Sequence, residues 1–212
     1  MRWTFGDPIT TARLRLRPVT PADADALLDY RSLPEVARYV PFEPHDAQMV
    51  AERIAGRWSE TTLDDENRSL LLGIALADSD RVIGDLTLMM GPPEHRSAEL
   101  GWVLHPAQSG HGYATEAVHA LMGLVFDDLG LHRVTARIDA RNEASLRLAD
   151  RLGMRREAHL VQNEWFKGGW SDEIDVALLE DEWVAQRAGD QTDLRAPSGQ
   201  GDGTGTIGGR SA

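Results

Sequence analysis

The segment Gln108-Ser109-Gly110-His111-Gly112-Tyr113-Ala114-Thr115-Glu116 carries most of the information about the fold. It follows a predicted strand that stops at Pro106, and it leads into a predicted helix with apolar residues at helical spacing. Free N–H groups and the positive end of the helix dipole converge at such a junction and bind anions such as pyrophosphate. Gly110 and Gly112 let the backbone bend and approach an anion closely. The residues alone fit a tight strand-to-helix turn equally well.

Two other nucleotide-binding motifs do not fit this segment. A Walker loop requires Gly-Lys-Ser/Thr at its end, and a Rossmann fingerprint requires a third glycine where this chain has Thr115. ATP and NAD are therefore poor candidates for the ligand.

The predicted elements upstream begin with a strand at residues 12–17, where Ala12, Leu14 and Leu16 alternate with outward-facing arginines. Thr20, Pro21 and Asp23 are typical of a helix start. A second helix is expected over residues 45–62. Extended runs at residues 69–77 and 81–90, separated by turn residues, predict an antiparallel hairpin, and residues 98–104 predict a further strand.

Downstream of the segment, the helix is expected to end at Gly130. A strand at residues 133–138, a helix at 143–152 closed by Gly153, and two strands on either side of residues 167–169 follow. The order β, α, α, β, β, β, α, β, α, β, β predicts a mixed α/β (α+β) fold. We expect a mostly antiparallel sheet of about seven strands flanked by about four helices.

The end of the chain has a different composition. After about Gln186, glycine, serine, threonine and proline replace the apolar residues. We therefore expect one domain over residues 1–187 and a disordered, glycine-rich tail over residues 188–212.

Charge and composition restrict the class of protein. The 212 residues carry a formal net charge of -12 and contain no cysteine. The charge disfavours nucleic acid and favours a cationic partner, and the lack of cysteine excludes disulfides and a thiol nucleophile. We see neither a long apolar span nor a signal-peptide core, and so expect a cytoplasmic protein without membrane partners. The seven histidines show no metal-ligand spacing, so no metal is expected.

Asn142 and Ser145 form a second group of interest. Asn142 is placed to cap the helix at residues 143–152, and Ser145 shares the buried face of Leu148, Ala149 and Leu152. An inward-facing hydroxyl needs a hydrogen-bond partner. That partner is either a carbonyl of the same helix or a ligand.

Together these segments resemble the GNAT superfamily of N-acyltransferases, especially the RimJ/RimL-like branch that acetylates the N-termini of ribosomal proteins. The resemblance covers about residues 11–183 and rests on the glycine segment and on the block Asn142-x-x-Ser145. It implies acetyl-CoA as the co-substrate. The residues that it assigns to acetyl-CoA are Trp102, Val103, Leu104, Ser109, Gly110, His111, Gly112, Tyr113, Ala114, Thr115, Asn142 and Ser145.

The same resemblance implies Glu164 as the catalytic base and Ser145 as the acid. An amine of pKa about 8 to 10 must lose a proton before it attacks a thioester, and a carboxylate near Trp165 and Phe166 can take that proton through water. Glu164 is equally compatible with an exposed strand residue that pairs with Lys167 or an arginine. Trp165 and Trp170 are expected near the acceptor pocket.

Other interpretations stay open. The donor is acetyl-CoA or another acyl-CoA such as succinyl-CoA, and the acceptor is a protein N-terminus or a small-molecule amine such as a polyamine. A catalytically silent CoA-binding module is the alternative from outside the enzymes. The oligomeric state is also open, with a homodimer among the options.

Overall fold

The computed structural model describes residues 2–193. The chain divides into two compact units, residues 1–180 and residues 181–212, and α6 (Glu180–Asp193) makes up the described part of the second. In the described part of the chain, no helix is long and apolar enough to cross a bilayer.

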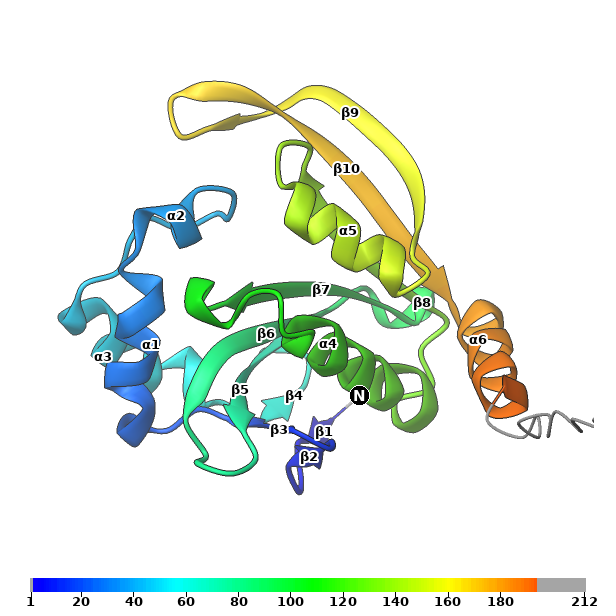
Figure 1. The fold of residues 1–212 in the computed structure, drawn as a ribbon, viewed down its shortest axis with the longest axis horizontal. Coiled ribbons are helices and arrows are strands. Elements are labelled where there is room, and N and C mark those ends of the chain that lie inside the picture. Colours follow the sequence, from blue (N-terminus) through cyan, green and yellow to red (C-terminus); the bar gives the residue numbers. More distant parts are fainter. Residues whose placement is uncertain (1, 194–212) are drawn as a thin grey trace, which may run out of the picture. The chain divides into compact units, whose positions relative to one another are not determined.

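The first unit is built on an eight-stranded sheet with the order β2-β3-β5-β6-β7-β8-β10-β9 (Figure 1). All neighbouring strands are antiparallel except β7 and β8, which run parallel. A short pair, β1–β4, stands apart from this sheet. The strands are β1 (Trp3–Thr4), β2 (Ile9–Thr10), β3 (Leu14–Pro18), β4 (Thr62–Leu63), β5 (Ser69–Leu76), β6 (Val82–Met90), β7 (Ser97–Leu104), β8 (Arg133–Asp139), β9 (Arg155–Phe166) and β10 (Gly169–Leu179).

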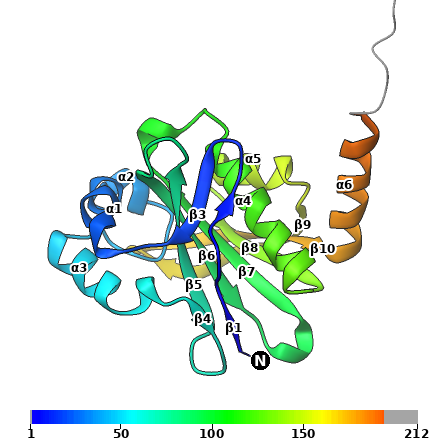
Figure 2. The same ribbon diagram turned by 90° about the horizontal axis from the view of Figure 1, so that it is seen from below.

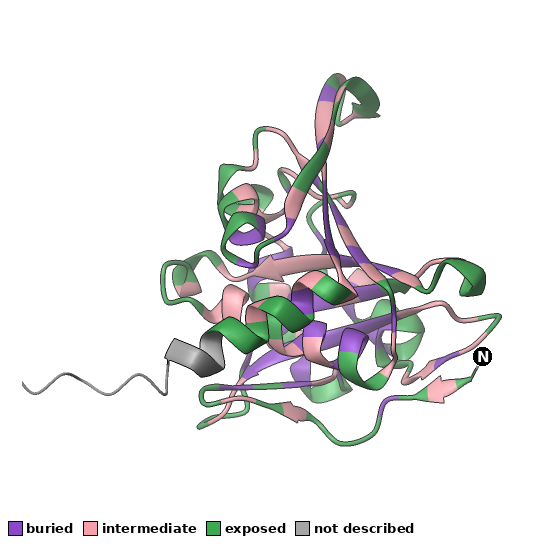
Figure 3. Cartoon of the chain, turned by 90° about the vertical axis from the view of Figure 1, so that its right-hand side faces the viewer, coloured by how far each residue is buried: buried purple, intermediate pink, exposed green. Residues whose placement is uncertain are grey.

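Helices cover both faces of the sheet, with α1 to α3 on one side and α4 on the other (Figure 2). They are α1 (Ala24–Arg31), α2 (Pro34–Ala37), α3 (Ala47–Ala55), α4 (Tyr113–Gly123) and α5 (Glu143–Arg151). Leu27, Val50 and Ile54 from the first group pack with Leu71 and Val82 of the sheet. Burial is highest along the central strands, whereas the end of the β9–β10 hairpin is exposed (Figure 3).

The mixed, mostly antiparallel fold predicted from the sequence is confirmed, with several differences in its elements. The helix expected over residues 45–62 ends at Ala55, because Gly56 leaves the helical region at φ -104° and ψ -120°. The helix α4 ends in a π-helical turn, Leu124–Asp128, before Gly130. Arg17 does not face outward, since its side chain is 15% exposed and pairs with Asp23.

Short elements escaped the sequence analysis. The strands β1, β2 and β4 have two residues each, and α2 has four, so none offers a full period of hydrophobic alternation. The helix α6 runs to Asp193, so the boundary expected after residue 187 falls within a helix. Residues 194–212 of the expected tail lie outside the described residues.

Candidate active site

The glycine segment forms the loop that leads into α4. Gly110 and Gly112 have φ of 83° and 79°, a region that favours glycine. Gly112 is the N-cap residue, and no side chain caps the helix. The first-turn N–H groups of α4 therefore keep their hydrogen-bonding capacity, and a Cβ at Gly110 would meet no atom within 4 Å. A backbone cradle of this kind fits a pyrophosphate.

Glu116 ties the first turn of α4 to the turn between β2 and β3, a contact that the sequence analysis missed. Its carboxylate accepts hydrogen bonds from Thr11 Oγ1 at 2.5 Å and from Arg13 Nε at 2.6 Å. Arg13 also donates to the carbonyl of His111 at 2.9 Å and lies over the Tyr113 ring. Burial disfavours the charged form of Glu116, but these bonds outweigh it and lower its pKa. In the sequence, the alternating arginines before Pro18 were the one pattern that could have indicated this contact.

Strands β7 and β8 diverge next to this loop. The β7–β8 ladder stops at Glu99 and Thr135, although β7 continues to Leu104 and β8 to Asp139. On its other side β7 stays paired with β6 as far as Leu104. The backbone groups of residues 100–104 that point toward β8 have no strand partner and are available to a ligand between the strands.

Ser145 and Trp102 meet at this divergence. The indole N–H of Trp102 donates to Ser145 Oγ at 3.0 Å, and Asn142 caps α5 by accepting from the backbone N–H of Ser145. The partner that the structure shows for Ser145 Oγ is the indole of Trp102 and not a carbonyl of its own helix. Because Oγ accepts from Trp102, its own proton is free to donate into the cleft.

A cleft of about 670 Å³ brings five of the predicted site residues together. They are Trp102, Val103, Asn142, Ser145 and Glu164. Leu104 and the loop at residues 109–115 do not line it. The predicted site residues thus fall into two groups, one in the loop beside α4 and one in the cleft, and the end of β7 connects them.

The hairpin contributes Glu164 and Phe166 to the cleft, but not its tryptophans. Successive residues of a strand face opposite sides, so Trp165 points away from Glu164. Trp165 and Trp170 are 62% and 57% exposed and pack edge to face at 5.5 Å. Trp165 and Trp170 were expected near the acceptor pocket, but neither lines the cleft. The side chain of Glu164 has no hydrogen bond or ion pair with another described residue, including Lys167.

The hairpin forms one wall of the cleft, and the wall opposite the hairpin was also missed by the sequence analysis. It contains the buried ion pair of Arg31 with Asp85, in which Nε and NH2 of Arg31 lie 3.0 and 2.6 Å from the carboxylate. Tyr30 donates its hydroxyl to the same carboxylate at 2.5 Å. Phe42, His45 and Trp58 line the cleft around this pair.

Lys167 joins the two walls across the cleft. Its Nζ donates to the carbonyls of Ala37 at 2.5 Å and Phe42 at 2.7 Å. Lys167 and Gly168 form the hairpin turn, with φ of 48° and 83°. Figure 1 shows the hairpin reaching over α5 toward α2. The cleft is therefore bridged at one side.

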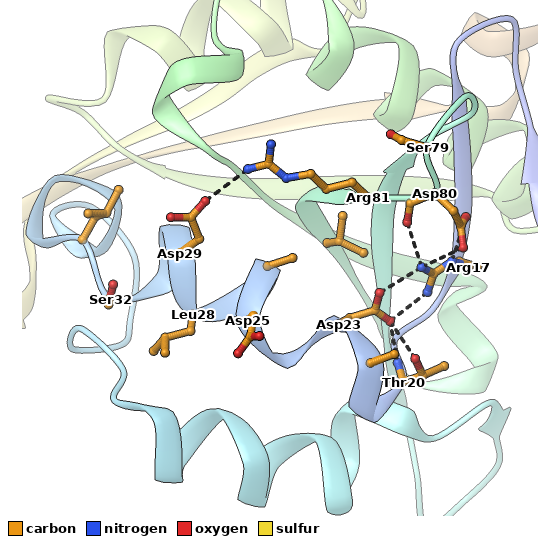
Figure 4. Close-up of a pocket in the computed structure, with 14 residues that line it drawn as sticks. Arg17, Thr20, Asp23, Asp25, Leu28, Asp29, Ser32, Ser79, Asp80 and Arg81 are labelled. Carbon is orange, nitrogen blue, oxygen red and sulfur yellow. Dashed lines mark hydrogen bonds and ion pairs between the residues drawn. The ribbon is translucent and has the colours of Figure 1, made fainter.

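A second large hollow lies beside α1 (Figure 4), with a volume of about 1150 Å³. Most of its carboxylates are already paired: Asp23 and Asp80 with Arg17, and Asp29 with Arg81. No cluster of three or more potential metal ligands occurs within residues 2–193. The hollow thus offers little to a charged ligand.

Known proteins match the part of the chain that contains the loop and the divergent strands. The model of a family described as Acetyltransferase (GNAT) domain matches residues 13–155, which include the loop, β7, α5 and the start of β9. The uncharacterized N-acetyltransferase YnaD of Bacillus subtilis is 32% identical over 183 residues, covering 82% of this chain and 98% of YnaD.

Two further proteins are similar to this chain. The structure of an acetyltransferase (GNAT family) from Bacillus anthracis superposes with a TM-score of 0.74 at 26% identity, covering 82% of this chain and 99% of that one. The putative ribosomal N-acetyltransferase YdaF of Bacillus subtilis is 27% identical over 168 residues, covering 68% of this chain and 92% of YdaF.

Proposed function

This chain belongs to the GNAT acetyltransferase family and is an N-acetyltransferase that moves an acetyl group from acetyl-CoA to an amine, and we propose that transfer occurs in the cleft beside Trp102 and Ser145. The observation that carries this proposal is the Trp102–Ser145 hydrogen bond at the divergence of β7 and β8. It places a hydroxyl next to unpaired backbone donors at the end of the cleft.

Acetyl-CoA supplies an activated acetyl thioester. The pyrophosphate is held by the N–H groups of the loop at residues 109–115 and the first turn of α4. Unpaired N–H groups of β7 near Trp102 and Val103 bind the pantetheine arm and stabilise the negative charge that develops on the carbonyl oxygen. Leu104 contributes only through its backbone, because its side chain lies outside the cleft.

Glu164 and Ser145 carry the proton transfers. Glu164 takes a proton from the acceptor ammonium, directly or through one water, so that the nitrogen lone pair can attack the thioester carbon. Ser145 Oγ–H, whose oxygen is held by Trp102, donates to the sulfur as the carbon–sulfur bond breaks. Neither step requires a covalent bond to the protein.

We assign the RimJ/RimL-like type as the subtype, with a protein N-terminus or a small primary amine as the acceptor. The motif around Gly110 and Gly112 supports this assignment, as does the similarity to YdaF over most of both chains. The two walls of the cleft leave space for an extended amine next to Ser145.

The test is steady-state kinetics of Glu164→Gln and Ser145→Ala across pH, with an N-terminal peptide and a small amine as acceptors. We expect Glu164→Gln to lower kcat by about a hundredfold and to remove the acid limb of the pH–rate profile. Ser145→Ala should lower kcat by about tenfold with little change in KM for acetyl-CoA. Unchanged rates and profiles would show that these two residues do not act as base and acid.

Glu157→Gln serves as the matched control for loss of a carboxylate on β9. Glu157 pairs with Arg133 and Arg155 and does not line the cleft. Its kinetic parameters should match those of the wild type.

A further inference from the structure

The two walls of the acceptor cleft carry opposite charges, and of these charged groups only Glu164 takes part in the proposed mechanism. Arg31, His45 and Arg53 line it on the side of α1 and α3. Glu164 and Glu173 line it on the side of the hairpin. The difference bears on which amine the enzyme accepts.

The positive wall is organised around one indole ring. The guanidinium of Arg31 lies 4.4 Å from the centroid of the Trp58 ring, and that of Arg53 lies 5.6 Å from it. Asp85 compensates the charge of Arg31. Arg53 has no hydrogen bond or ion pair with another described residue. This wall therefore keeps one uncompensated positive charge.

His45 adds a buried donor without an acceptor. It is 3% exposed, and both Nδ1 and Nε2 are buried without a hydrogen-bond partner. Its ring stacks on Phe42 at 5.0 Å. Burial, followed by the charges of Arg31 and Arg53, lowers the pKa of His45 to about 4, so the imidazole is neutral. A buried N–H without a partner is costly, and such groups in native proteins usually have a role.

The hairpin wall has the reverse character. Glu164 is unpaired, and Glu173 accepts a hydrogen bond from the amide of Asn163. Glu99 lies between the walls, 3.7 Å from Arg137. Burial raises the pKa of Glu99 against the effect of Arg137, and Asp175 and Glu173 raise it further. An ammonium is therefore favoured on this side.

We infer that the acceptor is an aminocarboxylate, with its amine beside Ser145 and Glu164 and its carboxylate held by Arg53 and His45 on the opposite wall. The inference rests on the proposed function. A carboxylate supplies the acceptor that the His45 N–H lacks and the countercharge that Arg53 lacks. A diamine or polyamine would bring a second cation to Arg53 and is disfavoured. The carboxylate belongs either to a free amino acid or to an acidic peptide.

The test measures product binding, which does not depend on turnover. N-acetylated straight-chain ω-aminocarboxylates of increasing length are titrated calorimetrically into the full-length protein, with and without CoA. N-acetylated alkylamines and monoacetylated diamines of equal length are titrated in parallel. We expect the aminocarboxylate of best length to bind at least about tenfold more tightly than either analogue. Equal affinities across the series would overturn the inference.

The same titrations with variants of the protein show which residues bind the carboxylate of the ligand. Arg53→Gln should abolish the preference for the aminocarboxylate, and Arg53→Glu should reverse it in favour of the diamine product. Arg57→Gln, four residues further along the chain and outside the cleft, removes the same charge and should leave the preference intact. A preference that survives Arg53→Gln would contradict the inference.

His45→Phe keeps the stacked ring and removes both ring nitrogens. It should fold with at least wild-type stability and lose most of the preference, because the orphaned donor is gone. Undiminished preference in this variant would exclude His45 from the site.

Peptides distinguish the source of the carboxylate. N-acetylated peptides with an acidic second residue are compared with the same peptides carrying its amide. A preference seen only with peptides identifies a peptide acceptor, and one seen only with the straight-chain series identifies a free amino acid. Titration of the same samples with acetyl-CoA separates the two proposals. If the protein does not bind acetyl-CoA, the proposed function is contradicted. The preference for the aminocarboxylate product is measured independently and tests this inference alone.

Discussion

The acetyl-CoA side and the acceptor side of the site are built in different ways. On the first, backbone groups of one loop, one strand end and one helix start make up the proposed binding surface, and most of it falls within residues 102–117. On the second, charged and aromatic side chains from α1, α3, the loop after α2 and the hairpin converge from distant parts of the sequence. A site formed by backbone groups depends on the local sequence, whereas a wall formed by side chains from distant segments depends on the tertiary fold.

The two sides should therefore respond differently to substitution. Changes on the acceptor side remove buried side-chain interactions and should affect stability. Changes on the acetyl-CoA side should affect ligand affinity with little effect on folding. The predictions below test this separation.

The largest expected effect is on the acceptor side. Arg31→Met leaves the carboxylate of Asp85 buried, at 1% exposure, without its countercharge, and should lower the free energy of unfolding by about 3 to 5 kcal/mol. Urea denaturation measures it. Arg81→Met, which breaks the exposed pair with Asp29, is the control and should cost no more than about 1 kcal/mol.

The double variant Arg31→Met with Asp85→Asn sharpens this prediction. Removing both charges should restore much of the lost stability, because no unpaired charge then stays buried. If the single variant is as stable as the wild type, the pair does not organise the acceptor wall.

On the acetyl-CoA side, Glu116→Gln should weaken acetyl-CoA binding by about tenfold. It removes the negative charge that accepts the hydrogen bonds of Thr11 and Arg13 and so weakens the link between the start of α4 and the turn before β3. Because Arg13 is about half exposed, the free energy of unfolding should change by less than about 1 kcal/mol. Calorimetric titration and denaturation on one sample measure both quantities.

Glu143→Gln is the matched control, since Glu143 pairs with Arg147 on the exposed face of α5. The Glu143→Gln variant should bind acetyl-CoA with the same affinity as the wild type. A large loss of stability with unchanged affinity in Glu116→Gln would contradict the separation between the two sides.

The smallest effect is expected at the bridge between the walls. Lys167→Met removes two hydrogen bonds to backbone carbonyls and should increase hydrogen exchange at residues 37–43 by about tenfold. kcat/KM for bulky acceptors should rise by a few fold, because the bridge limits entry. Unchanged exchange would show that the bridge does not hold the walls together.

Lys167 is the only lysine in the chain, which provides an independent measurement on the wild type. An amine-selective reagent can modify only Lys167 and the N-terminus, and peptide mapping by mass spectrometry distinguishes the two sites. Slow modification of Lys167 relative to the N-terminus is the expected result, because its Nζ is held by two carbonyls.

The contrast also explains what could be predicted from the sequence. The turn at Gly110 and Gly112 and the capping by Asn142 are local features with a recognisable pattern, and the structure shows both of them. Arg31, His45 and Arg53 had no such pattern, because their significance arises only when α1 and α3 pack on β5 and β6. Trp165 was misplaced for a related reason, since its side of the strand depends on the register of the hairpin.

The central claim is that acetyl-CoA binds along the loop at residues 109–115 and the end of β7. The most direct test is isothermal titration of the wild type and of Gly112→Trp with acetyl-CoA, succinyl-CoA and free CoA. At φ 79°, with Arg13 3.5 Å from the position of a Cβ, a tryptophan at residue 112 should block the loop. Gly130→Asn is the control, because Gly130 also has a positive φ but lies away from the site. We predict saturable binding of acetyl-CoA to the wild type and the control, weakened by about a hundredfold or more in Gly112→Trp. Equal binding by Gly112→Trp, or no binding of any CoA species to the wild type, would contradict the account.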